Sequence, residues 1–272
     1  MTTIVTWKTL SLFHSTEEIP GVFMIADSRV SQSGSQMVNV LTDRCAKLFE
    51  IDIRVHTTNG PECQRIGVAV AGNSLVAHNC VFCMQQILSN LGGESPPILP
   101  EVAEFANHVL TSISLDVSQL LTTPAQAEVI IMGTASNGEY EVISVRPSSA
   151  NPSQYLTETI TSFPYVIGSD AKFFLEEYEK LVSPDLPKQH VEQLPFLVFD
   201  RLFLNKQSLR ATGGEMQILV LEQHELKRYS PQRWNPEDQR YECYMFGIDI
   251  SRLQIGNCCV GARPWLLDDI QK

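Results

Sequence analysis

Residues 21–26 read GVFMIA, an uninterrupted apolar run with Pro20 before it and Asp27 after it. A run of this length is typical of a strand that is buried on both faces. A strand at the surface of a sheet would instead alternate apolar and polar residues, because one of its faces would meet solvent. The sequence therefore predicts a sheet inside a layered structure, covered on both sides.

Strands and helices occur in separate groups along the rest of the chain. The expected strands and hairpins lie at 3–7, 47–51, 67–71, 128–134 with 139–145, up to 167, and 215–222 with 225–229. The expected helices lie at 74–91, 101–115, 170–182 and 193–204. Because the two kinds of element do not alternate strictly, a doubly wound parallel sheet is not expected. We predict an α+β fold, a four-layer αββα sandwich in which two antiparallel sheets pack face to face beneath helices.

Two segments read as long loops, and the end of the chain reads as an extension. The loops are 8–20 and 52–66, the second with a strong turn signal at Asn59-Gly60-Pro61. The tail holds one more strand candidate, at 242–248. We predict one domain at 1–229 and a C-terminal extension at 230–272 that packs on it.

Composition excludes several kinds of partner. The formal net charge of −11 argues against nucleic acid and against an anionic membrane surface, since both repel an acidic protein. The start has no basic region followed by an apolar core, so no signal peptide is expected, and no apolar run reaches about 18 residues. Seven cysteines, an odd number, favour reduced thiols and a cytoplasmic location.

The sequence also gives no sign of a metal or cofactor site. It has no GxGxxG or GxxxxGK[ST] motif and no HExxH spacing, so neither a nucleotide nor a metal is expected. Cys80 and Cys83 have CxxC spacing but lie in an apolar helical segment, which favours core packing over metal binding.

Six fragments, taken in order, resemble one family. They are TTIV at 2–5, IADSR at 25–29, AKLFEI at 46–51, GVAVAGNS at 67–74, IGSD at 167–170 and TGG at 212–214. Together they resemble a proteasome β-subunit or its bacterial relatives among the N-terminal-nucleophile (Ntn) hydrolases, over roughly 2–229. The resemblance implies a threonine peptidase.

The opening threonine would carry the chemistry. A threonine hydroxyl is a weak nucleophile without a base beside it. Once Met1 is removed, the α-amine of Thr2, with an ordinary pKa of about 7.7–8.0, can serve as that base. Thr2 could equally be an ordinary strand residue near a terminus, and the other motifs favour the nucleophile.

The resemblance assigns further roles. Asp27 and Lys47 match the acidic and basic members of the catalytic group, and Arg29 matches a structural arginine beside the aspartate. A lysine before an apolar strand needs a buried partner, and Asp27 is the natural one. Gly72 matches the glycine whose backbone N–H stabilises the oxyanion, a role suited to a strand end before a helix.

The supporting residues depart from the family pattern. Ser169 matches a helper serine, but Asp170 follows it where glycine is usual. Thr212 stands in place of a serine, and Leu209 stands where the family has an aspartate. The supporting network is therefore incomplete unless another acid, such as Asp170, supplies the charge.

The resemblance also implies a substrate pocket and an assembly. The pocket for the residue before the cut bond would be lined by Val30, Cys45, Phe49 and Val70, so we expect a preference for apolar side chains. We expect peptides or unfolded proteins as substrates. We also expect a homo-oligomer, a ring or helical stack of six or more copies, served by a separate ATPase unfoldase. Two alternatives stay open: an Ntn amidase acting on a small amide, and a catalytically inactive scaffold subunit.

Overall fold

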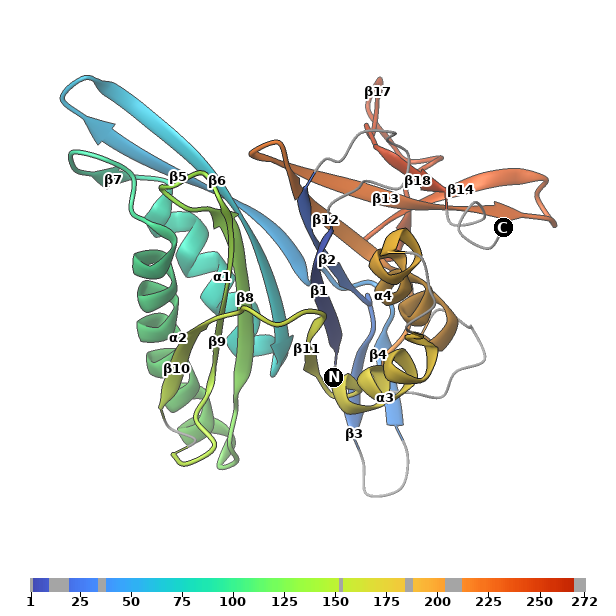
Figure 1. Cartoon of the computed structure of the whole chain (residues 1–272), viewed down its shortest axis with the longest axis horizontal. Coiled ribbons are helices and arrows are strands. Elements are labelled where there is room, and N and C mark those ends of the chain that lie inside the picture. Colours follow the sequence, from blue (N-terminus) through green and yellow to red (C-terminus); the bar gives the residue numbers. More distant parts are fainter. Residues whose placement is uncertain are drawn as a thin grey trace.

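The computed structural model describes residues 2–9, 20–33, 38–151, 154–183, 188–203 and 212–266. This described part is mostly β, with 43% strand and 27% helix, and it contains two curled, half-barrel sheets and four helices (Figure 1). The predicted α+β, four-layer αββα sandwich is therefore wrong. Long strands twist, so these sheets curl instead of stacking as regular layers.

The larger sheet has eight strands and contains the apolar run at its centre. Its order is β11-β1-β2-β12-β13-β14-β15, with β18 paired to β13. The bounds are β1 Thr3–Thr9, β2 Gly21–Ala26, β11 Tyr165–Gly168, β12 Gln217–Glu222, β13 Glu225–Asn235, β14 Arg240–Met245, β15 Ile248–Asp249 and β18 Pro264–Leu266. Neighbours along this order from β11 to β15 run antiparallel, whereas β18 lies parallel to β13.

The second sheet has six strands in the order β10-β9-β8-β6-β5-β7. The bounds are β5 Leu48–Thr57, β6 Gly60–Gly72, β7 Leu91–Gly92, β8 Ala127–Thr134, β9 Tyr140–Pro147 and β10 Tyr155–Thr159. Two small hairpins complete the strands: β3 Val30–Ser33 with β4 Val38–Thr42, and β16 Gln254–Ile255 with β17 Cys258–Cys259.

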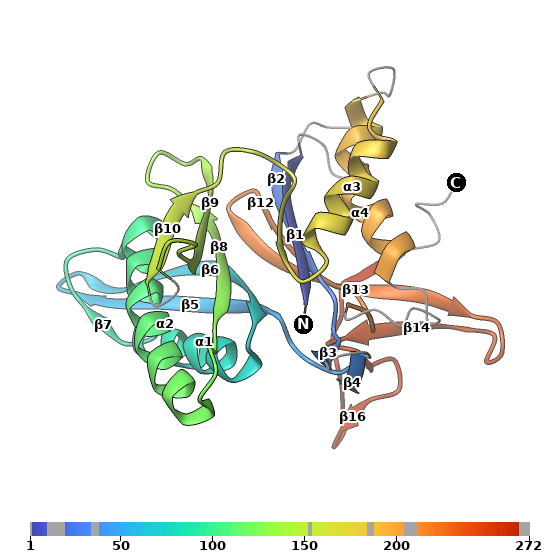
Figure 2. The same cartoon turned by 90° about the horizontal axis from the view of Figure 1, so that it is seen from below.

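Four helices lie in two pairs on the outer faces of the two sheets (Figures 1 and 2). They are α1 Ser74–Leu88, α2 Leu99–Leu121, α3 Ala171–Leu181 and α4 Lys188–Phe203. The first pair covers the six-stranded sheet and the second pair covers the eight-stranded sheet. The four predicted helices are therefore confirmed, although α2 extends beyond its predicted end and starts two residues earlier.

Strand β2 is buried on both faces, as the GVFMIA run predicts. Val22 and Met24 join the apolar cluster between the two sheets, whereas Phe23 and Ile25 join the cluster beneath α3 and α4. Apolar side chains on both faces of this strand are therefore removed from water. This burial contributes a free energy of roughly 25 cal/mol per Å² of apolar surface.

The predicted loop at 52–66 is wrong, because most of it belongs to the long β5–β6 hairpin. Ile51, Ile53 and Val55 are buried, and the residues between them are exposed. This alternation has the period of two that defines a half-buried strand. The Asn59-Gly60 turn signal is correct and marks the end of the hairpin.

The end of the chain continues the larger sheet. The predicted boundary at residue 229 falls inside β13, and the predicted strand at 242–248 corresponds to β14 and β15. The Trp265 ring packs edge-on against Phe23 and Tyr229, with ring centroids 5.9 and 5.0 Å apart. The division into a domain and an extension stays a prediction, and these contacts tie the two parts together.

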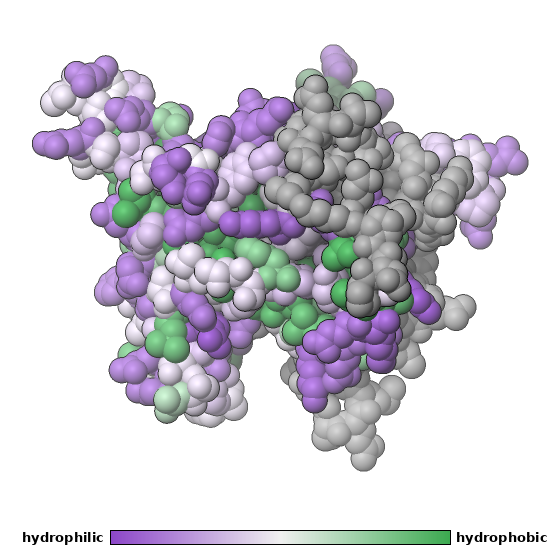
Figure 3. All heavy atoms as spheres, viewed as in Figure 1, coloured by the Kyte–Doolittle hydropathy of each residue, from purple (hydrophilic) through white to green (hydrophobic). Residues whose placement is uncertain are grey.

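The surface in Figure 3 is mixed, with polar residues prominent at the tips of the two halves and apolar residues towards the middle. Among the described helices, none combines the length and the apolar character that crossing a membrane requires.

Candidate active site

A cavity of about 300 Å³ opens beside the start of β1. Its lining includes six residues that the sequence singled out: Thr2, Val30, Cys45, Lys47, Val70 and Gly72. They come from the chain start, β3, the segment before β5, and the end of β6, and the first turn of α1 closes the cavity. Phe49, the remaining predicted pocket residue, is not part of the lining.

Thr2 is buried and directly precedes β1 of the larger sheet, next to the end of β11. Its carbonyl oxygen accepts a hydrogen bond of 2.8 Å from the backbone N–H of Ser169. This approach needs glycine at 168, whose φ is +102° and whose hypothetical Cβ would lie 1.9 Å from the Thr2 oxygen. The resemblance assigned Ser169 a side-chain role, and the contact that fixes Thr2 is made by its backbone.

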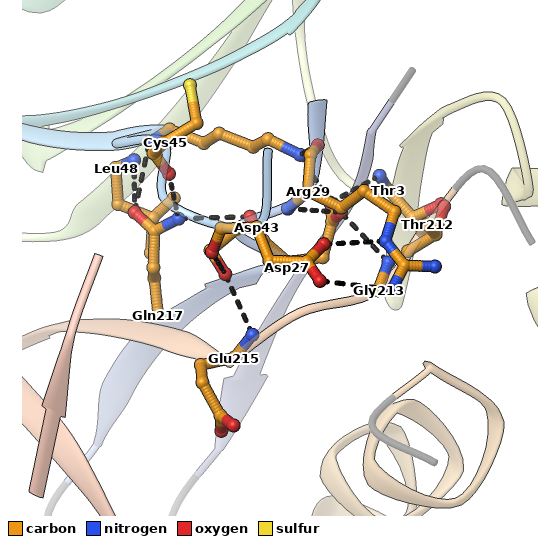
Figure 4. A network of polar contacts seen from close by, with 12 residues as sticks. Thr3, Asp27, Arg29, Asp43, Cys45, Leu48, Thr212, Gly213, Glu215 and Gln217 are labelled. Atoms are coloured by element: carbon orange, nitrogen blue, oxygen red, sulfur yellow. Dashed lines mark hydrogen bonds and ion pairs between the residues drawn. The ribbon is translucent and has the colours of Figure 1, made fainter. Parts of the chain in front are cut away.

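Asp27 follows β2 and has a fully buried carboxylate that accepts four hydrogen bonds (Figure 4). Oδ1 accepts from Lys47 Nζ at 2.8 Å and from the backbone N–H of Thr3 at 3.1 Å. Oδ2 accepts from the backbone N–H groups of Arg29 and Gly213, both at 3.1 Å. Four donors satisfy the charged form of a carboxylate, so burial does not leave this charge without partners.

Lys47 is 2% exposed, and its ammonium group faces Asp27. Besides the carboxylate, Nζ donates to the backbone carbonyl of Arg29. Burial lowers the pKa of Lys47 from its ordinary value, and the neighbouring Asp27 opposes that change. The Asp27–Lys47 pair expected from the sequence is therefore formed in the structure.

Gly72 ends β6 and lines the same cavity as Thr2. Its φ is +101°, and a Cβ there would lie 2.6 Å from the carbonyl oxygen of Gln126, so only glycine fits. Asn73 follows it and caps α1, with Oδ1 accepting from the backbone N–H groups of Leu75 and Val76. The positive end of a helix therefore lies at this wall of the cavity.

Gln217 is a buried residue that the sequence analysis missed. Its Nε2 donates to the backbone carbonyls of Asp27 at 3.0 Å and of Cys45 at 2.8 Å. Its Oε1 accepts from the backbone N–H groups of Lys47 at 2.9 Å and of Leu48 at 3.3 Å. One amide thus ties the backbones of both charged residues together, and the only signal was a glutamine at the start of an otherwise apolar strand.

Arg29 lies beside Asp27, as the resemblance implies, but its guanidinium group pairs elsewhere. Nε donates to Oδ1 of Asp43 at 2.7 Å, while the backbone N–H of Arg29 bonds Asp27 and the carbonyl of Gly213. The ion pair holds the segment after β4 against the site, and Asp43 was not foreseen.

The remaining supporting residues surround this network. The hydroxyls of Thr212 and Thr3 lie 2.8 Å apart, and both residues are fully buried. Asp170 precedes α3 without capping it, and its Oδ2 is buried without a hydrogen-bond partner in the described part of the chain. Leu209, at the position of the family's aspartate, lies outside the described residues.

His78 forms a wall of the cavity and was not predicted. Nδ1 lies 2.8 Å from the carbonyl oxygen of Ser74, and Nε2 lies 2.9 Å from that of Ala46 and 3.6 Å from Sγ of Cys45. The contact with Cys45, together with the two carbonyls, raises the pKa of His78 to about 9 against the opposing effect of burial. The Phe49 ring packs edge-on behind it, with centroids 5.9 Å apart.

The predicted core role of the CxxC pair is confirmed. Cys80 is buried in the cluster between α1, α2 and the six-stranded sheet, and Cys83 packs against that cluster. Burial raises the pKa of the Cys80 thiol to about 12, which makes it a poor metal ligand or nucleophile.

No family model matches the sequence, and no curated protein matches it. The fold does match solved structures. Anbu (ancestral beta-subunit) from Yersinia bercovieri is similar with a TM-score of 0.53 and 13% identity, over 84% of this chain and 87% of that one. The Anbu complex from Pseudomonas aeruginosa, described as a helical assembly, gives 0.54 and 14%, over 84% and 86%. A Gly-1 mutant of Anbu from Hyphomicrobium sp. strain MC1 gives 0.55 and 14%, over 84% and 87%.

These structures correct the resemblance drawn from the sequence. The neighbours are Anbu proteins, which are proteasome-like but form a distinct family, so the assignment to proteasome β-subunits and their bacterial threonine-peptidase relatives is wrong. At 13–14% identity the likeness concerns the fold alone.

Proposed function

We propose that this protein is an N-terminal threonine peptidase with Thr2 as the nucleophile. One observation carries the proposal: a buried Asp27–Lys47 pair, Thr2 and Gly72 converge on a single cavity. A buried ion pair contributes little net stability, because desolvation offsets its attraction, so its presence at the cavity that Thr2 lines favours a chemical role.

The proposed reaction has two steps. The Thr2 amine, freed by removal of Met1, accepts the hydroxyl proton as Oγ1 attacks the substrate carbonyl. The backbone N–H of Gly72 stabilises the oxyanion, and the leaving amine takes the proton, which leaves an ester on Thr2. Water then hydrolyses the ester by the same proton path and releases the acid.

Lys47 and Asp27 have positioning roles in this scheme. Lys47 lines the same cavity as Thr2, and its positive charge would favour the alkoxide that develops on the Thr2 oxygen. Asp27 holds that ammonium in place and also anchors the backbone of Thr3, the next residue along the strand. The roles of Ser169, Asp170, Arg29 and Thr212 stay supporting ones in this proposal.

We further propose that the protein acts as a homo-oligomer that hides its sites. The helical assembly described for the Pseudomonas aeruginosa Anbu complex supports this, as do exposed apolar side chains on α1 and α2, among them Phe82 at 60% exposure and Leu120 at 76%. A single species at the monomer mass in light scattering at micromolar concentration would contradict it. A separate ATPase partner stays a prediction.

The test begins with the mature protein. Intact mass should show the loss of Met1, and a threonine-directed electrophile should label Thr2. Thr2→Ala should lower peptide hydrolysis to background and change the free energy of unfolding by no more than about 1 kcal/mol, while Thr2→Ser should keep part of the activity.

Thr3→Val is the matched control, because it removes a hydroxyl from the neighbouring residue and leaves the Thr3 backbone bond to Asp27 in place. It should retain most activity. Hydrolysis by Thr2→Ala, or by a chain that keeps Met1, would overturn the mechanism. Turnover of small amides but not peptides would favour the amidase, and absence of any labelling would favour the scaffold.

A further inference from the structure

The cavity contains a second cation besides Lys47. His78 lies one turn into α1, and each of its two ring nitrogens is within 2.9 Å of a backbone carbonyl oxygen. A neutral imidazole has one N–H and one lone pair, so it can satisfy only one of the two carbonyls. The imidazolium ion has two N–H groups and satisfies both, so this geometry selects the charged ring.

The charge on His78 has no carboxylate to neutralise it. The groups that contact the ring are the carbonyls of Ser74 and Ala46, the thiol of Cys45, and the Phe49 ring. Among the residues that line the cavity there is no Asp or Glu in the described structure, and Lys47, its other charged residue, is matched by Asp27.

The helix end adds to the same positive field. The first turn of α1 contains no acidic residue, and its N-terminus lies at the wall that carries His78. The surrounding protein is acidic, with a net charge of −11, so this cavity is a positive site in a negative molecule.

The structure also changes the basis for the expected apolar preference. Phe49 does not line the cavity, and His78 lies in front of it with the Phe49 ring at its back. Val30 and Val70 remain as apolar lining residues, so the pocket combines apolar walls with a charged side. An aliphatic stem that ends in a negative charge fits this combination.

We propose that this pocket selects an acidic side chain, glutamate or aspartate, in the residue before the cut bond, with His78 as the specificity-determining residue. The inference rests on the proposed peptidase function, and it names the substrate class of that site. Both N–H groups of His78 already donate to carbonyls, so the ring can select a substrate side chain only by its charge. A peptide with glutamine in place of glutamate should therefore be a poorer substrate.

The first test compares fluorogenic peptides that differ only in this residue: Glu, Gln, Leu and Lys. We expect kcat/KM for Glu to exceed that for Gln by about tenfold. In His78→Gln the Glu-to-Gln ratio should fall to about one, while in His108→Gln, a change of the same kind at an exposed histidine of α2, the ratio should stay as in the wild type. Equal rates for Glu and Gln in the wild-type protein, or Leu above Glu, would overturn the proposal.

The second test uses pH and the unchanged protein. Glutamate is ionised throughout the range from pH 7 to 10, so only the protein's charge changes there. The pKa of His78 near 9 means that the ring loses its charge as pH rises through that value. The Glu-to-Gln ratio of the wild type should therefore decline between pH 8 and 10, and a constant ratio would contradict the proposal.

A binding experiment separates this inference from the peptidase mechanism. The Thr2→Ala protein is titrated with acetylated tripeptides that end in Glu, Gln or Leu and have a free C-terminus. Binding is measured by calorimetry and by the NMR signal of the His78 ring. Selective binding of the Glu peptide with a shift of the His78 signal supports the pocket even if no hydrolysis is found. Equal binding of the three peptides, without such a shift, would refute it even if Thr2 proves to be the nucleophile.

Discussion

The two walls of the cavity each hold a cation, and they hold it differently. In the segment before β5, Lys47 is 2% exposed and bonded to the carboxylate of Asp27. On the side of α1, His78 is half-buried and its ring nitrogens face backbone carbonyls. A carboxylate neutralises the first cation inside the protein, whereas no carboxylate contacts the second among the residues that the structure describes.

This difference separates two tasks. A buried, paired ammonium is fixed in position and influences only a group in direct contact with it, as expected for a residue beside a nucleophile. A cation whose partners are backbone carbonyls and the Cys45 sulfur, and not a carboxylate, projects its field into the cavity, as expected for a residue that selects a ligand. The two walls can therefore be tested separately.

Breaking the buried pair should have the largest effect. Lys47→Ala leaves the carboxylate of Asp27 without its charged partner, which costs about 3–5 kcal/mol in the free energy of unfolding. Hydrolysis should also fall to background. Chemical denaturation measures the first quantity and a peptide assay the second.

Lys172→Ala is the control for that experiment, because Lys172 is an exposed residue of α3. It should change neither quantity measurably. Retention of wild-type stability in Lys47→Ala would show that the pair is not formed in solution.

Replacing Gln217, whose side-chain amide joins the backbones of Asp27 and Lys47, should have an intermediate effect. Gln217→Leu keeps the size of the side chain but leaves backbone groups of Asp27 and Lys47 buried without partners, at a cost of about 2–3 kcal/mol. The kcat should fall because Lys47 is less well fixed. The Glu-to-Gln ratio should change much less, because Gln217 reaches His78 only through the backbone of Cys45.

Gln119→Leu, on the exposed face of α2, is the matched change. Both its stability and its kcat should equal those of the wild type. A loss of the Glu-to-Gln ratio in Gln217→Leu would show that the two walls are coupled, contrary to the comparison above.

The smallest effect should come from His78, as a pH dependence of its contribution to the free energy of unfolding. The pKa of His78 is raised from 6.5 to about 9 in the folded protein, so its stabilising contribution is complete below pH 6.5 and is lost as pH rises through about 9. Solvent reaches part of the ring and screens its interactions, so we expect about 1 kcal/mol. The difference in unfolding free energy between the wild type and His78→Gln should therefore be largest near pH 6 and vanish near pH 10.

His108→Gln should show no such pH-dependent difference from the wild type. A difference for His78→Gln that stays constant from pH 6 to 10 would mean that the ring is not charged in the folded state.

Local sequence patterns predicted much of the fold. The GVFMIA run predicted β2 with its bounds, and the spacing of apolar residues predicted four helices, because burial of one or two faces determines where apolar residues occur in the sequence. The β5–β6 hairpin was not predicted although Ile51, Ile53 and Val55 alternate with polar residues, since the strong turn signal at Asn59-Gly60 is also typical of a loop. The curl of the sheets leaves no such trace, because it arises from twist summed over paired strands.

The site divides in the same way. The opening TT and the resemblance of six fragments indicated Thr2, Asp27, Lys47 and Gly72 before any fold was known, although the solved structures of similar fold correct the family that the resemblance named. Only the tertiary structure decided which groups surround them. Gln217 and His78 are far from Asp27 and Lys47 in the sequence, and their importance comes from backbone carbonyls and N–H groups that every residue possesses. A backbone group has no signature in a sequence, so a site built on such groups becomes visible only when the chain is folded.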